Sequence, residues 1–142
     1  MKVLIGVDDS KFSHAAVESV AGRTWKPGTE VKVISAVEPP FIPESEGIGL
    51  EGNHYEIARK AIDHALATLR ASNNHFELMG DIVEGSAKHV ILDEADRWNA
   101  DLIVVGSHGR KGLDRFLLGS VSQAVALHAK CSVEIVRTPQ RP

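Results

Sequence analysis

The expected fold follows from the stretch Leu102-Ile103-Val104-Val105-Gly106-Ser107-His108-Gly109, after which nine further residues lead to Gly119-Ser120. Its four leading apolar residues predict a buried strand, and a helix is predicted to begin near Val121. Between them, glycine allows a ligand to approach the backbone N–H groups closely. The positive end of the following helix attracts anions. The stretch therefore predicts a phosphate site of the kind found in nucleotide pockets.

Outward from this stretch, short apolar runs alternate with segments of helical periodicity. Strands are predicted over residues 3–7, 31–37, 76–83, 102–105 and 133–136. Helices are predicted over residues 10–22, 57–69, 87–98 and 121–129. This strict alternation predicts one domain over residues 1–142, an α/β fold with a mostly parallel sheet, doubly wound with helices on both faces.

The carboxyl ends of parallel strands are where ligands bind in such folds, at the point where the strand order reverses. Asp8 and Asp9 follow the first predicted strand, and Gly106 follows the fourth, so both elements fall on the same sheet edge. Residues 38–52 are rich in proline and glycine and form an unusually long connection. Loops of that length are typically binding loops or disordered segments.

The start of the last predicted helix offers hydrogen-bond donors to a phosphate. Ser120 followed by Gln123 fits a capping box, with Ser120 as the cap. The N–H groups of Ser120, Val121 and Ser122 are then available to phosphate oxygens, with both serine hydroxyls in reach. A helix N-terminus favours an anion at an exposed site by roughly 0.3–1 kcal/mol, which is too little for tight binding. Gly106 and Gly109 must therefore allow further backbone N–H groups to reach the phosphate. Taken alone, Gly119-Ser120 fits a plain helix start as well.

Other phosphate and nucleophile motifs are excluded by their spacing. The chain has no Gly-x4-Gly-Lys-Ser/Thr run, as a P-loop requires. No Gly-x-Gly-x-x-Gly fingerprint follows the first strand. In Gly106-Ser107-His108-Gly109 the serine directly follows the first glycine, which does not fit the Gly-x-Ser-x-Gly elbow of hydrolases.

Composition narrows the expected partners and location. The 142 residues are 43% hydrophobic and 25% charged, as is ordinary for a soluble globular protein. A net charge of −3 gives no footprint for nucleic acid, and no apolar run approaches the length of a membrane helix. The opening residues 1–6 do not resemble a signal peptide. The single Cys131 allows no internal disulfide, which favours the cytoplasm.

The glycine spacing resembles that of a known family. The pattern Gly-x2-Gly-x9-Gly-Ser is similar to the motif of the ATP-binding branch of the universal stress protein family. In this chain it consists of Gly106, Gly109, Gly119 and Ser120. The opening Val3–Ser10 resembles the family's first strand and acidic turn, and the resemblance covers essentially the whole chain. It implies a five-stranded sheet in the order 3-2-1-4-5 and a homodimer through the last strand. It also implies that the ligand is ATP.

The resemblance implies a role for each candidate site residue. Asp8 would lie near the ribose or bind a divalent cation, Mg²⁺ or Mn²⁺. Backbone groups of Ala36 and Val37, at the end of the second strand, would meet adenine. The other positions would line the ribose and phosphates, the last four holding the phosphate tail: Gly106, His108, Gly109, Gly119, Ser120, Val121 and Ser122.

The function expected from these features is a signalling or stress-response switch, in which ATP stabilises one conformation or assembly. Two alternatives stay open: a slow ATPase or self-phosphorylating enzyme with Ser120 or Ser122 as acceptor, and a nucleotide-free scaffold. We identify no general base and no activated nucleophile in the sequence, so at most weak turnover is expected. The other histidines show no metal-ligand spacing and are expected at the surface or an interface: His14, His54, His64, His75, His89 and His128.

Overall fold

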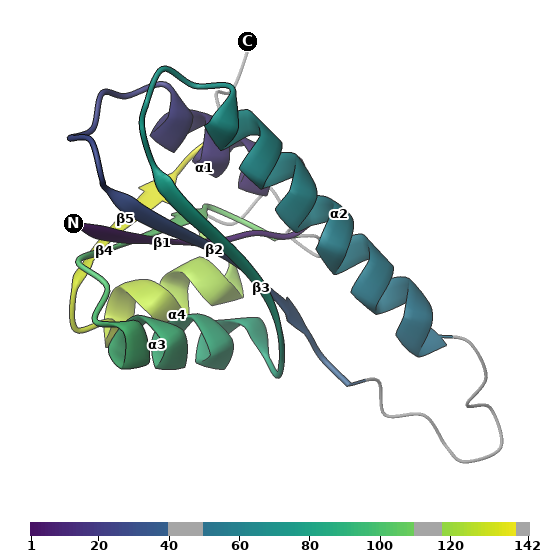
Figure 1. Ribbon diagram of the computed structural model, residues 1–142. Helices are drawn as coiled ribbons and strands as arrows, with labels where there is room; N and C mark the ends of the chain where they lie inside the picture. The colour runs from purple at the N-terminus through teal and green to yellow at the C-terminus, as the bar shows by residue number, and fades with distance from the viewer. Residues whose placement is uncertain (40–49, 110–117, 139–142) are drawn as a thin grey trace, which may run out of the picture.

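Strand β1 lies at the centre of a five-stranded parallel sheet in a computed structural model that describes residues 1–39, 50–109 and 118–138 (Figure 1). The strand order β3-β2-β1-β4-β5 confirms the order 3-2-1-4-5. Most of the long proline- and glycine-rich connection, residues 40–49, lies outside the described residues. The strands are β1 (Lys2–Gly6), β2 (Glu30–Val37), β3 (Glu77–Glu84), β4 (Leu102–Gly106) and β5 (Ser132–Val136).

Helices cover both faces of this sheet, as predicted (Figure 1). They are α1 (Lys11–Ala21), α2 (Leu50–Arg70), α3 (Ala87–Trp98) and α4 (Ser120–His128). α1 and α2 lie on one face, and α3 and α4 lie on the other. α2 begins seven residues earlier than the predicted residue 57. Among residues 54–70, Ala58 is the first buried side chain, and Tyr55 and Glu56 before it are exposed and add nothing to the apolar stripe.

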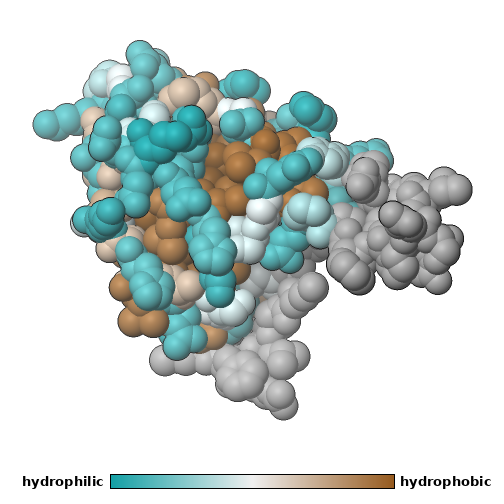
Figure 2. Space-filling view, turned by 90° about the horizontal axis from the view of Figure 1, so that it is seen from below, coloured by the Kyte–Doolittle hydropathy of each residue, from teal (hydrophilic) through white to brown (hydrophobic). Residues whose placement is uncertain are grey.

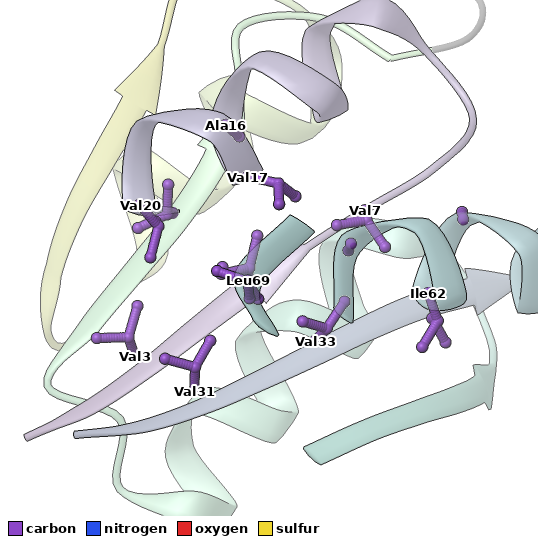
Figure 3. Packing of buried hydrophobic residues seen from close by; sticks show 13 residues of the cluster. Val3, Val7, Ala16, Val17, Val20, Val31, Val33, Ile62 and Leu69 are labelled. Atoms are coloured by element: carbon purple, nitrogen blue, oxygen red, sulfur yellow. The ribbon is translucent and has the colours of Figure 1, made fainter. Parts of the chain in front are cut away.

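The core consists of two apolar clusters that the sheet separates. Val3 and Ile5 point towards α1 and α2, whereas Leu4 between them points towards α3 and α4. Because both faces are covered, β1 is a continuous apolar run rather than an alternating one. Figure 3 shows the first cluster, in which Leu69 and Val17 from the helices pack on the valines of β1 and β2.

The two outer strands are less buried than the central ones. No residue of β3 or β5 is fully buried, as is expected for strands at the two edges of a sheet. Glu134 interrupts the apolar run of β5 and forms an ion pair with Arg23, with Nη2 and Oε2 2.7 Å apart. Seen from the side of α3 and α4, hydrophilic side chains surround an apolar area (Figure 2). Ala36 and Val83 are half-buried apolar residues packed against the cluster on this side.

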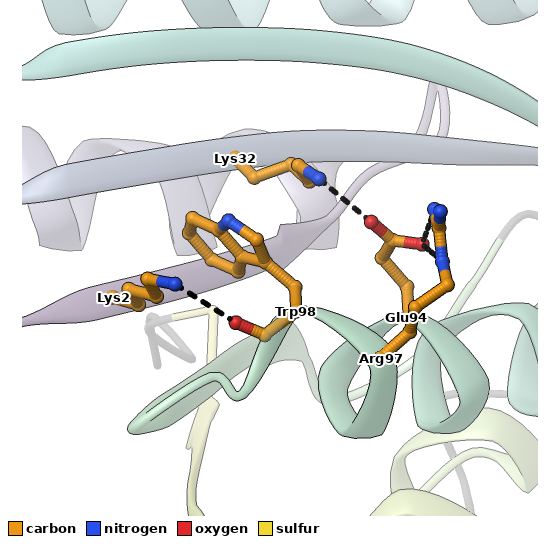
Figure 4. Close-up of polar contacts among 5 residues, drawn as sticks. All are labelled: Lys2, Lys32, Glu94, Arg97 and Trp98. Atoms are coloured by element: carbon orange, nitrogen blue, oxygen red, sulfur yellow. Dashed lines mark hydrogen bonds and ion pairs between the residues drawn. The ribbon is translucent and has the colours of Figure 1, made fainter.

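A buried carboxylate joins α3 to the sheet (Figure 4). The Glu94 side chain is 6% exposed, and its Oε1 lies 2.7 Å from Lys32 Nζ on β2. Its other oxygen accepts hydrogen bonds from Arg97. The Trp98 ring lies under two ammonium groups, 5.5 Å from Lys2 Nζ and 5.0 Å from Lys32 Nζ. A buried charge of this kind is tolerated because it is paired and hydrogen-bonded.

This carboxylate gives stability a pH dependence. Burial raises the pKa of Glu94, but the hydrogen bonds from Lys32 and Arg97 outweigh burial and hold the pKa below its ordinary value. A carboxyl whose pKa is lowered by folding stabilises the protein above its unfolded pKa, and this stabilisation is lost as pH falls through the folded value. We expect Glu94→Gln to cost about 3 kcal/mol at pH 7, because Lys32 loses its buried partner. The deficit should shrink below about pH 4.

Urea unfolding at a series of pH values measures this deficit. The matched control is Asp93→Asn, which removes an exposed carboxylate one residue away on α3 and should change stability by less than about 0.5 kcal/mol. A Glu94→Gln deficit that stays constant from pH 7 to pH 3.5 would contradict the role given to Lys32 and Arg97.

Candidate functional site

The segments that follow β1 and β4 meet at the carboxyl edge of the sheet. β1 and β4 are neighbouring parallel strands, so their carboxyl ends lie side by side. Asp8 follows β1, Gly109 follows β4, and α1 and α4 both begin at this edge. A Cβ atom added to Gly109 would lie 3.2 Å from Asp8 Oδ2. The structure thus brings together two candidate residues that are far apart in the sequence.

Asp8 is held by the first turn of α1. Its Oδ1 accepts hydrogen bonds from the backbone N–H of Ser10, at 2.9 Å, and from the Ser10 hydroxyl. Its own N–H donates to Ser13 Oγ at 2.9 Å. Ser10 is also the N-cap of α1, and its side chain accepts from Ser13 N. The second carboxylate oxygen, Oδ2, lies on the side of Gly109.

Ser10 and Ser13 are positioning residues that the sequence analysis missed. The signal was present, because an aspartate two residues before a serine is typical of a turn in which the carboxylate accepts from the following backbone. With one oxygen fixed by Ser10, the orientation of the other towards Gly109 is set before any ligand arrives.

The start of α4 is tied to the glycine loop through Ser107. The carbonyl of Ser107 accepts from Gly119 N–H at 2.7 Å and from the Ser122 hydroxyl at 2.8 Å. The predicted capping role of Ser120 is wrong: Gly119 is the N-cap and Ser120 is the first helical residue. Gly119 takes this place because its N–H bond to Ser107 holds it in an extended conformation. Ser122 is 2% exposed, and its hydroxyl donates within the protein.

Backbone N–H groups in the first turn of α4 remain as donors. The first helical bond at this end runs from Gln123 N to Gly119 O at 3.0 Å. The N–H groups of Ser120, Val121 and Ser122 precede it, and the first residues of a helix have no intrahelical acceptor. Ser120 is exposed and Val121 is half-buried. With the helix dipole behind them, such groups suit an anion.

At the end of β2, the backbone groups of the two residues predicted to contact adenine face opposite sides. Ile34 O accepts from Val7 N at 2.9 Å, so the backbone groups of Ile34 face β1. The register with β1 ends at Ile34, and Ala36, two residues further on, faces the same side beyond the end of β1. Val37 O instead accepts from Gly85 N at 3.0 Å. The backbone of Ala36 faces the candidate site, whereas the carbonyl of Val37 faces the β3 side.

Gly106 and Gly119 have packing roles within the protein. A Cβ atom at Gly106 would lie 2.5 Å from Phe12 O, so the backbone of α1 occupies the space beside this glycine. At Gly119, a Cβ atom would lie 3.1 Å from His108 Cα. The His108 ring contacts Phe12, with centroids 5.1 Å apart, and its Nδ1 lies 3.1 Å from Ser107 Oγ. These contacts fix the glycine loop against the starts of α1 and α4.

The described side chains limit how a metal ion could be bound. No group of three histidine, cysteine, aspartate or glutamate side chains in the described part of the chain is placed to hold a metal ion. Asp8 fits a cation site of a different kind, because Mg²⁺ is commonly bound by one or two carboxylates together with substrate phosphates and water.

Within residues 1–39, 50–109 and 118–138, no helix is long and apolar enough to cross a bilayer.

Sequence comparisons place this architecture among known proteins. The family model described as "Universal stress protein family" matches residues 1–137. The chain is 44% identical to universal stress protein A homolog 2 of Coxiella burnetii over 92 residues, which cover 64% of this chain and 59% of that protein. It is 30% identical to universal stress protein MJ0531 of Methanocaldococcus jannaschii over 146 residues, covering 99% of this chain and 84% of that protein. The chain thus matches less than two thirds of the first relative and most of the second.

Solved structures share the fold. Hypothetical protein MJ0577 matches with a TM-score of 0.78 at 23% identity, covering 99% of this chain and 97% of that one. A universal stress protein in complex with cAMP matches with a TM-score of 0.71 at 26% identity, covering 98% of both chains. With its glycine spacing, its sheet order 3-2-1-4-5 and the family match over residues 1–137, the chain belongs to the universal stress protein family.

Proposed function

We propose that this chain binds ATP at the carboxyl edge of its sheet and acts as a nucleotide-dependent stress-response switch. The observation that carries the proposal is that Asp8 lies beside Gly109, and the start of α4 lies beside His108 of the same glycine loop, at that edge. The phosphate tail would lie at the N–H groups of Ser120 and the two residues after it. The related structure with bound cAMP supports an adenine nucleotide as the ligand class.

The other parts of the nucleotide follow from this placement. The backbone of Ala36 faces the region beyond the end of β1 and would hydrogen-bond the edge of adenine. The ribose would lie beside Asp8 and Gly109, whose close approach to each other depends on the absence of a side chain on Gly109. Asp8 Oδ2 would also be the protein ligand of Mg²⁺ or Mn²⁺, whose other ligands would be phosphate oxygens and water.

A switch requires that the bound nucleotide affect an assembly or a conformation. β5 is an edge strand, and edge strands present unpaired backbone groups that a second copy can use. On α4, Leu127 is 70% exposed, and α4 contacts β5. We infer a homodimer through β5, in which the phosphate tail stabilises the start of α4 and through it the dimer.

Turnover is the alternative that this geometry leaves open. Self-phosphorylation would need an accessible hydroxyl near the phosphate tail. Ser120 is exposed, whereas Ser122 is buried and donates to Ser107 O. If the protein modifies itself, Ser120 is therefore the favoured acceptor of the two.

The test is to denature protein purified without added nucleotide and to identify the released small molecules by mass spectrometry. ATP in a stoichiometric amount would support a binding protein with little turnover, and ADP would indicate hydrolysis. No released nucleotide, together with no thermal shift on adding ATP and Mg²⁺, would contradict the proposal and favour a nucleotide-free scaffold.

Replacing Asp8 tests its role towards the cation. Asp8→Asn keeps the hydrogen bonds to Ser10 possible but removes the charge, so ATP affinity should fall about tenfold in Mg²⁺ and much less in a chelator. Calorimetric titration with ATP under both conditions measures this difference. Asp9→Asn, an exposed neighbour, is the matched control and should change affinity less than about threefold. An equal loss for Asp8→Asn in Mg²⁺ and in chelator would assign Asp8 to the sugar or to the turn alone.

A further inference from the structure

Two histidines from different helices are in contact on the face covered by α1 and α2. The ring centroids of His14, on α1, and His64, on α2, lie 4.5 Å apart, and the ring planes are inclined by 41°. The two helices lie side by side over the same face of the sheet (Figure 1). His14 is half-buried and His64 is exposed. The proposed nucleotide site uses neither of them.

We propose that His14 and His64 together bind one divalent transition-metal ion, with Cu²⁺ bound most tightly and Ni²⁺ and Zn²⁺ more weakly. Imidazole nitrogens suit these metals, and their affinities for a given nitrogen site generally follow this series. With metal–nitrogen bonds of about 2 Å, two imidazoles on one ion have ring centres roughly 4.5–5.5 Å apart. The observed separation of 4.5 Å agrees with that range.

The backbones that carry the two rings are held in place by the core. His14 N donates to Ser10 O at 3.2 Å, within the turn that also binds Asp8. On α2, Ala65 is the neighbour of His64 and is 1% exposed. The helix positions are therefore fixed by packing, and the rings need only rotate about their side-chain bonds to direct one nitrogen each at an ion. The exposure of His64 leaves water to fill the remaining coordination positions.

This site differs in chemistry from the cation position proposed at Asp8. Mg²⁺ prefers oxygen ligands, whereas two imidazoles favour the transition metals named above. Binding at the histidine pair needs no nucleotide, so the two proposals can fail independently. A metal ion there would link α1 to α2 and would stabilise the folded chain by an amount that increases with the logarithm of the free metal concentration above Kd.

The experiment is a titration of the nucleotide-free protein with Cu²⁺ in a non-coordinating buffer, followed by electron paramagnetic resonance, with thermal shifts for Zn²⁺ and Ni²⁺. We expect one equivalent to bind more tightly than the rest and to show nitrogen hyperfine splitting. His14→Gln and His64→Gln should each weaken this binding at least tenfold and abolish the Zn²⁺ thermal shift. Mg²⁺ without nucleotide should give no shift in any of these proteins.

The matched control is His75→Gln, which removes an exposed histidine in the turn before β3 and should leave the tight equivalent unchanged. Circular dichroism checks that each variant is folded. His64→Gln is the variant least expected to disturb the fold, because His64 is exposed. The proposal is overturned if both His14→Gln and His64→Gln retain the tight equivalent. It is also overturned if His75→Gln weakens binding as much as they do.

Discussion

Gly106→Ala will destabilise the protein by about 2–3 kcal/mol, because its new methyl group has no space. A Cβ atom there would lie 2.5 Å from Phe12 O and 2.7 Å from Phe12 C. These are backbone atoms of α1, so the first turn of that helix would have to move away from β4. At the corresponding end of β1, a Cβ atom at Gly6 would lie 2.7 Å from Ile91 Cδ1. That atom is the end of a flexible side chain, so Gly6→Ala should cost less than about 1 kcal/mol.

Thermal and urea unfolding of the two variants measure this difference directly. For a chain of this size a loss of 2–3 kcal/mol lowers the melting temperature by roughly 6–12 °C. Both variants place alanine at the carboxyl end of a central strand, so Gly6→Ala is a matched control for strand propensity. Equal melting temperatures would mean that α1 does not pack on Gly106 as described. In that case the glycine would be required by a ligand alone.

Ser120→Pro is expected to weaken ATP binding by about 10- to 100-fold, whereas Ser120→Ala should change it by less than about threefold. Proline removes the backbone N–H but is accepted at the first position of a helix, where that N–H has no helical partner. It also requires an extended residue before it, and Gly119 has φ −78° and ψ 169°. Alanine removes the hydroxyl and keeps the N–H.

The pair of variants therefore distinguishes the backbone from the side chain of one residue. Calorimetric titration with ATP gives the affinities, and the melting temperature of Ser120→Pro without nucleotide should stay close to that of the unmodified protein. If Ser120→Ala were the more damaging change, the hydroxyl would be the phosphate ligand. If neither variant lost affinity, the phosphate tail would not lie at α4.

The sequence predicted the sheet well because burial leaves a simple pattern. Val3, Leu4 and Ile5 are apolar in succession, and the structure buries them alternately in two clusters. In the part of the chain that the structure describes, each strand and helix was predicted within a few residues, except for the start of α2. The strand order itself was implied by the family resemblance, since periodicity alone does not say which strands are neighbours.

The roles given to the site residues remain predictions, and the local details that differ in the structure depend on contacts between distant segments. The capping role of Ser120 looked sound locally, but the bond from Gly119 N to Ser107 O moved the cap by one residue. Val37 was grouped with Ala36, although the pairing with β3 directs its carbonyl away from the site. The packing of α1 on Gly106 could not be predicted from the motif, because a glycine allows the close approach of a ligand and of a helix backbone equally well.

The contact of His14 with His64 could not be predicted for a related reason. The two residues lie on different helices, and ligand spacing within one segment, the signal used for metal sites, does not detect pairs across α1 and α2. The same holds for the ion pair of Lys32 with Glu94, which joins β2 to α3. Such pairs follow from the fold once it is known.

The neighbouring positions of β1 and β4 also govern when the site can exist during synthesis. Asp8 emerges from the ribosome before its partners, Gly109 and the start of α4, and three other helix and strand pairs lie between them in the chain. Closing such a long chain segment makes this pairing one of the slower steps of folding. Nascent chains that end before residue 120 therefore lack the site, and the proposed nucleotide would stabilise chains that extend past this residue but not shorter ones.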